Sequence, residues 1–377
     1  MSEIKVNTIT DASGGNTTTV NGVTPNANTV RGRNLIINGA MQVAQRNTSV
    51  SSVASSGYKS LDRYQFDYSG AGTWTISQDS DTPSGFGSSM KFLCTASDAL
   101  DSGSDRVAFR QFIEGQNLQG IKKGTADAQT LTASFWVKSN KTGTYIVEIY
   151  DHDNARHINK SYTVSSADTW EYKTITFEAD TTGVLDNDNA LSLHLHFWLA
   201  AGSTYSGGTL QTSWGGNVTP NRAAGNVNLA DAVNNYFNIT GIQLEVGSVA
   251  TEFDHRSYGE EFAACERYYH KWVSQELYGN IAIGYSASSS NGRAVYYLPT
   301  TMRTTPSLSS GGSFRVINDG GTYGGSVSAI SIQRNHTKTP FIQFTTSANN
   351  LPGSDYQPVE MGANNDADAY IDFDAEL

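Results

Sequence analysis

The feature that most constrains the fold is an alternation of apolar and polar residues in the segment Thr130 to Lys138, TLTASFWVK. In an extended strand, successive side chains point to opposite faces of the sheet. The apolar face of this segment carries Leu131, Ala133, Phe135 and Val137. A strand with one apolar and one polar face is typical of antiparallel sheets. The segment therefore predicts a strand of an all-β fold.

Similar segments recur through residues 34–256, with turn residues between them. They are Arg63–Tyr68, Thr73–Gln78, Ser89–Ala96, Arg106–Ile113, Thr144–Tyr150, Thr169–Glu178, Leu191–Leu199 and Tyr236–Val246. The 36 glycines and the low charged fraction of 16% suit short strands joined by many turns. No stretch between the strands has the period of a crossover helix, which argues against a parallel sheet. We predict an antiparallel jelly-roll β-sandwich over 34–256.

The remaining sequence predicts a linking helix and a second β domain. Tyr258, Phe262, Cys265 and Tyr269 recur at helical spacing, which predicts a short connecting helix over 257–275. Strand-like segments separated by glycine pairs return over 276–377. They predict a smaller C-terminal β-sandwich domain.

Residues 1–33 differ from the rest because they hold few apolar side chains. We expect an extended arm that gains its core from other chains, with a disordered tail as the alternative. Its candidate contact residues are Ile4, Val6, Ile9, Val20 and Val23.

The charge and the cysteine count exclude several classes of function. A net charge of −11 argues against nucleic acid as the main partner, because phosphate binding needs clustered Lys and Arg. The sequence has no run of 18 apolar residues, so membrane insertion is not expected. The first residues do not resemble a secretory signal. Two cysteines, Cys94 and Cys265, cannot make a disulfide framework. A protein made in a reducing cytosol but exposed on a virion fits these properties.

The segment Leu191 to Leu199, LSLHLHFWL, carries the strongest binding candidates. Its polar face presents imidazoles and an indole, and a tryptophan of another strand could join them. Such a face suits sugars, because an aromatic plane receives ring C–H groups while polar groups bind hydroxyls. The glycan-contact candidates are Trp136, His194, His196 and Trp198. The alternative is that this face packs against a neighbouring subunit or an arm.

Metal binding is a weaker hypothesis. His194 and His196 have a spacing that lets a strand offer two imidazoles to one ion, and Asp151, His152, Asp153 and His157 form a second cluster. We expect hydrogen-bonded or solvated histidines instead, and no cofactor. The acidic loops 98–105 and 185–189 could hold a structural calcium ion, although they lack the EF-hand pattern. Ordinary acidic turns are the favoured interpretation.

Catalysis is not expected. The sequence has no G-x-S-x-G elbow, phosphate loop or H-E-x-x-H motif, and no recognisable pair of catalytic carboxylates. Both cysteines lie in apolar or helical surroundings, which favours inert buried thiols.

Several segments together resemble bacteriophage tail-fibre and tail-associated proteins. They are 2–25 (SEIKVNTITDASGGNTTTVNGVTP), 33–46 (RNLIINGAMQVAQR), 131–137, 237–252 (FNITGIQLEVGSVATE), 258–269 (YGEEFAACERYY), 298–306 (LPTTMRTTP) and 369–377 (AYIDFDAEL). The order of the segments, more than any one of them, carries the resemblance. The sandwich pattern also resembles carbohydrate-binding modules.

The resemblance implies a structural virion protein, made in the host cytoplasm and located in the tail. It implies a homotrimeric fibre whose arm binds the tail or an adaptor and whose β domains bind a host glycan or another receptor. A head fibre or capsid decoration protein is the alternative. A polysaccharide depolymerase and a carbohydrate-binding module of a secreted bacterial protein are less favoured.

Overall fold

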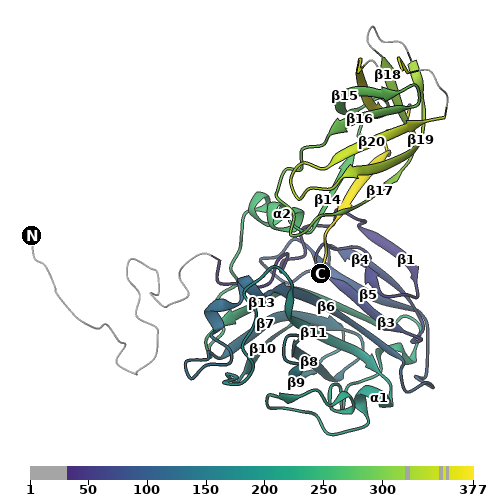
Figure 1. Ribbon diagram of the computed structural model, residues 1–377. Helices are drawn as coiled ribbons and strands as arrows, with labels where there is room; N and C mark the ends of the chain where they lie inside the picture. The colour runs from purple at the N-terminus through teal and green to yellow at the C-terminus, as the bar shows by residue number, and fades with distance from the viewer. Residues whose placement is uncertain (1–31, 319–322, 348–350, 354–355) are drawn as a thin grey trace, which may run out of the picture.

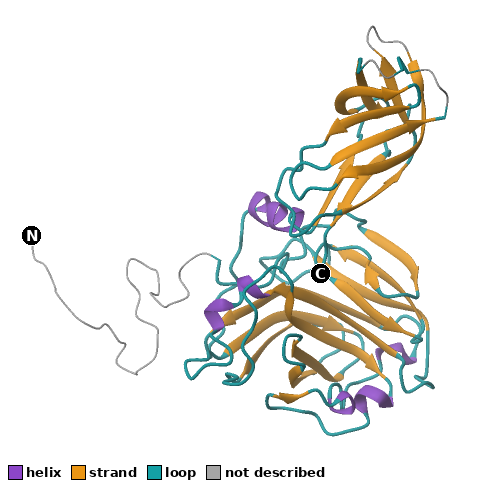
Figure 2. Ribbon diagram, in the orientation of Figure 1, coloured by secondary structure: helices purple, strands orange, loops and turns teal. Residues whose placement is uncertain are grey.

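The computed structural model describes residues 32–318, 323–347, 351–353 and 356–377, and strands dominate them (Figure 2). The prediction of an all-β fold with a sandwich and a short connecting helix is confirmed. The arm candidates Ile4, Val6, Ile9, Val20 and Val23 lie outside the described residues. Within them, every helix is too short or too polar to cross a bilayer.

Two antiparallel sheets form the sandwich (Figure 1). The six-stranded sheet has the order β1 (Ser49–Val53), β4 (Thr73–Asp79), β5 (Ser89–Ala96), β13 (Tyr236–Val246), β7 (Leu131–Ser139) and β10 (Glu171–Phe177). The seven-stranded sheet has the order β12 (Gly215–Gly216), β9 (Arg156–Val164), β8 (Gly143–Asp151), β11 (Leu191–Ala201), β6 (Arg106–Glu114), β3 (Gln65–Ser69) and β2 (Gly57–Tyr58). Short helices lie in the connections: the 3-10 turns Gly115–Asn117, Gln119–Ile121, Thr219–Asn221 and Leu229–Asp231, and α1 (Ser203–Ser206).

Apolar side chains from both sheets meet in one core. The predicted inner face of β7 is buried, with Phe135 fully inaccessible. Phe109 of β6 stacks on Phe197 of β11 at 4.9 Å and on Phe92 of β5 at the same distance, so aromatic rings join the two sheets. Burial of large rings of this kind contributes about 2–3 kcal/mol each to folding.

The linking segment begins as a helix and ends as a strand. Ser257 and Glu260 form a reciprocal capping box at the start of α2 (Tyr258–Glu266), which fixes its first turn. The predicted helical continuation toward residue 275 is wrong, because Tyr269–Val273 forms strand β14 and pairs with β22 (Tyr370–Asp374). The ladder with β22 gives these backbone groups partners that lie far away in sequence.

The C-terminal region is a smaller β domain, as predicted, and its six-stranded sheet closes into a barrel. Its closed order is β15 (Asn280–Ser288), β16 (Asn291–Val295), β20 (Phe341–Thr346), β19 (Tyr323–Arg334), β18 (Phe314–Asn318) and β21 (Pro358–Ala363). Beside it, β14, β22 and β17 (Ser307–Gly311) form a three-stranded sheet. Closure pairs both edges of the six-stranded sheet, which strand periodicity alone cannot reveal.

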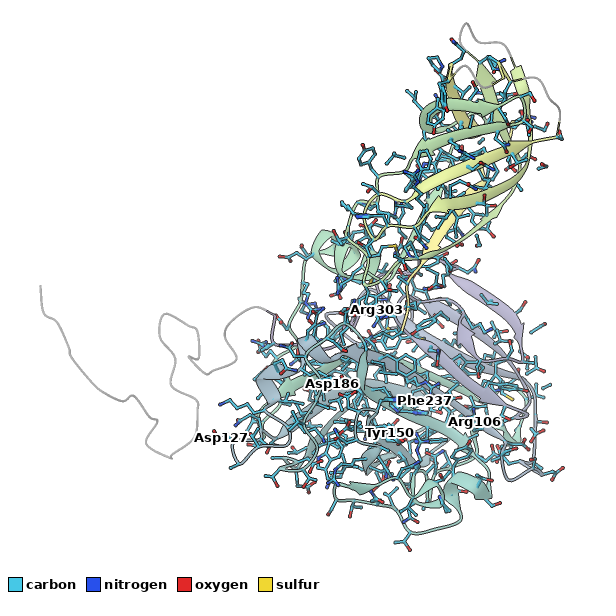
Figure 3. All side chains as sticks on the ribbon, viewed as in Figure 1. Arg106, Asp127, Tyr150, Asp186, Phe237 and Arg303 are labelled. Atoms are coloured by element: carbon cyan, nitrogen blue, oxygen red, sulfur yellow. The ribbon has the colours of Figure 1, made fainter. Side chains whose placement is uncertain are left out.

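Charged side chains join the sandwich to the C-terminal region. Buried Arg63 forms an ion pair with Glu376, and Arg46 pairs with Asp374 at 3.0 Å. Arg303, labelled at the junction in Figure 3, donates Nη1 to the Asn189 carbonyl of the sandwich. The barrel therefore stands on one end of the sandwich with its base held by specific contacts (Figure 1).

Candidate functional site

The structure separates the predicted glycan-contact residues. His194, His196 and Trp198 lie on the outer side of β11 in the seven-stranded sheet, whereas Trp136 lies on β7 in the other sheet. The prediction of one shared face is therefore wrong for Trp136. The predicted alternation of β11 is correct, because Leu193, Leu195 and Phe197 enter the core from its other side.

The three β11 residues are also buried. Trp198 and His196 are inaccessible and His194 is 2% exposed. The segment 202–223, which includes α1, crosses their side of the sheet: Ala223 packs with Trp198, and Tyr205 lies 5.3 Å from the Trp198 ring. Direct contact of these three side chains with a ligand is therefore not supported.

Strand register shows which side chains share this side of the sheet. Phe112, His194, Tyr150 and His157 form one cross-strand row. Gln65, Arg110, His196, Glu148 and Asn159 form the next row. We call this surface the β11 face and define it by its exposed or half-buried side chains, Arg106, Arg110, Tyr150, His152 and Arg222. Figure 3 labels Arg106 and Tyr150 on it.

Aromatic rings form the floor of the β11 face. The Tyr150 ring is nearly parallel to His194 at 5.4 Å, and the Arg222 guanidinium lies 5.0 Å from the centre of the Tyr150 ring. Arg110 lies 4.8 Å from the Phe112 ring in the same manner. Stacking of this kind fixes the two guanidiniums as flat groups against aromatic planes.

Two buried carboxylates hold the three arginines. Asp67 accepts hydrogen bonds from Arg106 at 2.9 Å and from Arg110 at 3.2 Å. Arg222 makes a two-pronged contact with Glu148 at 2.8 and 3.0 Å, and the Trp198 indole donates to the same carboxylate at 3.0 Å. Three guanidiniums face two carboxylates, so the group carries one excess positive charge.

The histidines on and beneath the β11 face are neutral near pH 7. Burial, reinforced by Arg110 and Arg222, lowers the pKa of His152 to about 4. Burial likewise lowers the pKa of His194 and of His196 well below the ordinary range. His152 Nε2 lies 2.8 Å from His194 Nδ1, so one ring donates to the other.

The structure brings together part of the proposed metal cluster. One ligand atom each from Glu148, His194 and His196 lie within 4.8 Å of one another. However, both Glu148 oxygens already accept hydrogen bonds from Arg222. A divalent cation would add charge beside a group that is already positive, so the electrostatics of the β11 face favour an anion over a cation.

The acidic loops form local turns. Asp98 Oδ1 accepts from the Leu100 amide, Asp105 Oδ2 from Ser102 and Asp188 Oδ1 from Ala190. These bonds are those expected of acidic turn residues. A structural calcium ion at either loop stays an untested alternative.

A second concave site lies between the sandwich and the three-stranded sheet. The cleft of about 350 Å³ is lined by Tyr58, Tyr269 and Tyr370 together with charged side chains of both signs. Arg46 lies 3.6 Å from the centre of the Tyr269 ring, and Lys271 lies 4.3 Å from that of Tyr370. The cations of this chain thus already cover these two tyrosine rings.

Sequence reasoning missed most of the β11 face. The alternation of Thr144–Tyr150 places Glu148 and Tyr150 opposite its apolar residues, so a signal for these two was available. Arg222 gives no local signal, because it lies in a loop 74 residues from Glu148.

Comparison with known proteins gives distant similarities. The sequence matches no known protein family and no curated protein. Among solved structures, the enzymatically active domain of tailspike protein 4 of bacteriophage CBA120 matches 57% of this chain at 12% identity and a TM-score of 0.30. The family 11 carbohydrate-binding module of Clostridium thermocellum, solved with a mixed-linked tetrasaccharide, matches 55% of this chain at 13% identity and a TM-score of 0.28.

The lengths matched differ between these two proteins. This chain covers 99% of the carbohydrate-binding module but 21% of the tailspike chain. Because identities and TM-scores are this low, no ligand or activity is transferred from either protein to this chain.

Proposed function

We propose that this chain is a non-enzymatic adhesion protein that binds glycans through the β11 face. The observation that carries the proposal is the combination of a half-buried Tyr150 ring with the guanidinium groups of Arg110 and Arg222 on one sheet surface. The Tyr150 ring lies in a row between His194 and His157, so a sugar would pack against the part of the ring that stays exposed and would accept hydrogen bonds from the fixed guanidinium groups.

We propose further that the protein is a bacteriophage tail fibre, located on the virion and trimeric. The ordered series of segments that resembles tail-fibre proteins supports this assignment. Three copies of a weak glycan site on one fibre would give tight overall adhesion through avidity. A head fibre or capsid decoration protein is the alternative, because such a protein would share every domain and differ in what its arm binds.

A glycan array probed with the full-length chain tests the first proposal. We expect binding to a defined group of polysaccharides, with no release of sugars on prolonged incubation. Failure to bind any glycan on an array that includes host surface polysaccharide would contradict the adhesion proposal, and released oligosaccharides would contradict the non-enzymatic one.

Labelling this chain on intact virions tests the second proposal. We expect the label at the tail, with three copies per fibre by cryo-electron microscopy. Label on the capsid would replace the tail-fibre assignment by the head-fibre or decoration assignment without affecting the glycan site.

A further inference from the structure

The charges of the β11 face do not cancel among themselves. Asp67 is shared by Arg106 and Arg110, whereas Glu148 pairs with one arginine of the three, Arg222. The carboxylates are buried, with side-chain exposures of 7% and 0%, whereas the three arginines keep between 14% and 23% exposed. The acids therefore lie beneath the sheet surface, while the guanidinium groups reach solvent.

Neighbouring groups compensate the excess positive charge only in part. His152 and His194 are neutral near pH 7, so they add neither positive nor negative charge. Asp151 forms an ion pair with Lys123 at 2.5 Å. The exposed Asp153 is the carboxylate whose charge raises the pKa of His152. Its effect on the His152 pKa is smaller than the effects of Arg110 and Arg222.

Arg110 shows the effect of this imbalance. Burial lowers the pKa of its guanidinium, and the positive charge of Arg222 lowers it further, although Asp67 acts in the opposite direction. A bound anion would relieve this repulsion. The two guanidiniums are also fixed in orientation by Phe112 and Tyr150, so little side-chain entropy would be lost when they bind one.

We infer that the ligand of the β11 face is an acidic saccharide, whose anionic group binds at Arg110 and Arg222 while its sugar ring lies against the exposed part of Tyr150. This inference rests on the proposed glycan function and specifies the class of glycan. Carboxylate and sulfate groups share the required chemistry, because each offers anionic oxygens to the guanidinium N–H groups that are not directed at Gln65, Asp67 or Glu148. The net charge of −11 of the chain does not oppose binding, since charges more than about 8 Å away are screened at physiological salt.

Calorimetric titration of the full-length chain with matched charged and uncharged ligands tests the inference. The carboxylate pair is oligogalacturonate, sialyl-lactose and alginate oligosaccharides against their carboxyl-reduced forms. The sulfate pair is carrageenan oligosaccharides against their desulfated forms. We expect at least one acidic ligand to bind about tenfold or more tightly than its uncharged form, with affinity that falls as salt is raised.

Variants locate the contact. Arg110→Gln should weaken binding of the acidic ligand about tenfold and remove most of its salt dependence, while Arg110→Lys should retain part of the salt dependence. Arg334→Gln, at an exposed arginine of β19, is the matched control for loss of one positive charge and should bind as the unaltered chain does. Thermal unfolding of each variant shows that it remains folded.

The outcomes separate this inference from the proposed function. Equal or tighter binding of the uncharged forms, or an unchanged affinity in Arg110→Gln, would overturn the acidic class and leave glycan binding intact. Absence of binding to every charged and uncharged ligand, together with a negative glycan array, would contradict both.

Discussion

The two outer faces of the sandwich begin from the same sequence pattern and end in different environments. On β7, the alternation leaves Trp136 and Lys138 half-buried, and Trp136 packs beside the exposed Tyr172 at 5.3 Å. On β11, the same alternation buries His194, His196 and Trp198 completely or almost so. Part of the difference arises because residues 202–223 pack over Trp198, while His194 lies among the rings of Phe112, Tyr150 and His152. Alternation thus predicts the direction of a side chain, and distant chain segments decide its exposure.

The largest expected difference between the faces concerns their ion pairs. Arg222→Gln leaves the fully buried Glu148 without its main partner, and we expect a loss of about 3–5 kcal/mol in the free energy of unfolding. Lys138→Gln on β7 breaks a pair with Asp81, which is 42% exposed, and should cost at most about 1 kcal/mol. Urea denaturation of both variants measures the contrast. Similar losses would show that the β11 face is not desolvated as described.

The tryptophans give a second, smaller contrast. Trp198→Phe removes the indole donor to Glu148 from an inaccessible position, and we expect a destabilisation of about 1–3 kcal/mol. Trp136→Phe removes no buried hydrogen bond that the structure records and should cost less than about 1 kcal/mol. The shifts in the thermal midpoint should follow this order, and the reverse order would contradict the burial of β11.

The buried histidines predict a pH dependence of stability that is not expected for the outer side of β7, which carries Trp136 and Lys138 and is called the β7 face. Their pKa values are lower in the folded than in the unfolded chain, so the unfolded chain binds more protons as pH falls below about 6.5. Stability contributed by these groups is therefore present above pH 6.5 and is lost on acidification. Replacing both His194 and His196 by Gln should reduce the slope of the unfolding free energy against pH between pH 7 and 5.5. The reduction should be up to about 1.4 kcal/mol per pH unit for each histidine.

The matched control for this experiment is His336→Gln, at an exposed histidine outside the sandwich. It should leave the slope of unfolding free energy against pH unchanged. An unchanged slope in the double variant at positions 194 and 196 would mean that these imidazoles are not held neutral by burial.

Sequence alone predicted the strands well because each carries its own local alternation. Alternation places Phe135 on the apolar face of its strand, and this residue is buried in the core; Leu193 and Phe197, which lie opposite the polar face of β11, are buried there as well. The strand β14 was missed because its stability comes from pairing with β22, about a hundred residues later. Closure of the C-terminal barrel was missed for the same reason.

The candidate site was less predictable than the fold. His194 and Trp198 were found by residue type and spacing, but their covering segment starts beyond the end of β11 and gives no local sign of where it packs. The sequence analysis groups Trp136 with them because alternation gives no information on strand order, and strand order decides to which sheet a strand belongs. Arg222 lies in a loop, so its place on the β11 face could be identified only from the three-dimensional structure.

The central claim is that glycans bind the β11 face and not the β7 face. Tyr150 on the one face and Tyr172 on the other allow a direct comparison. Affinity for the best glycan of the array should be measured for Tyr150→Ala, for Tyr172→Ala and, as a probe of the junction cleft, for Tyr370→Ala. We expect the first variant to lose about tenfold or more in Kd and the other two to bind normally. Full binding by Tyr150→Ala, with loss in either of the others, would contradict the account.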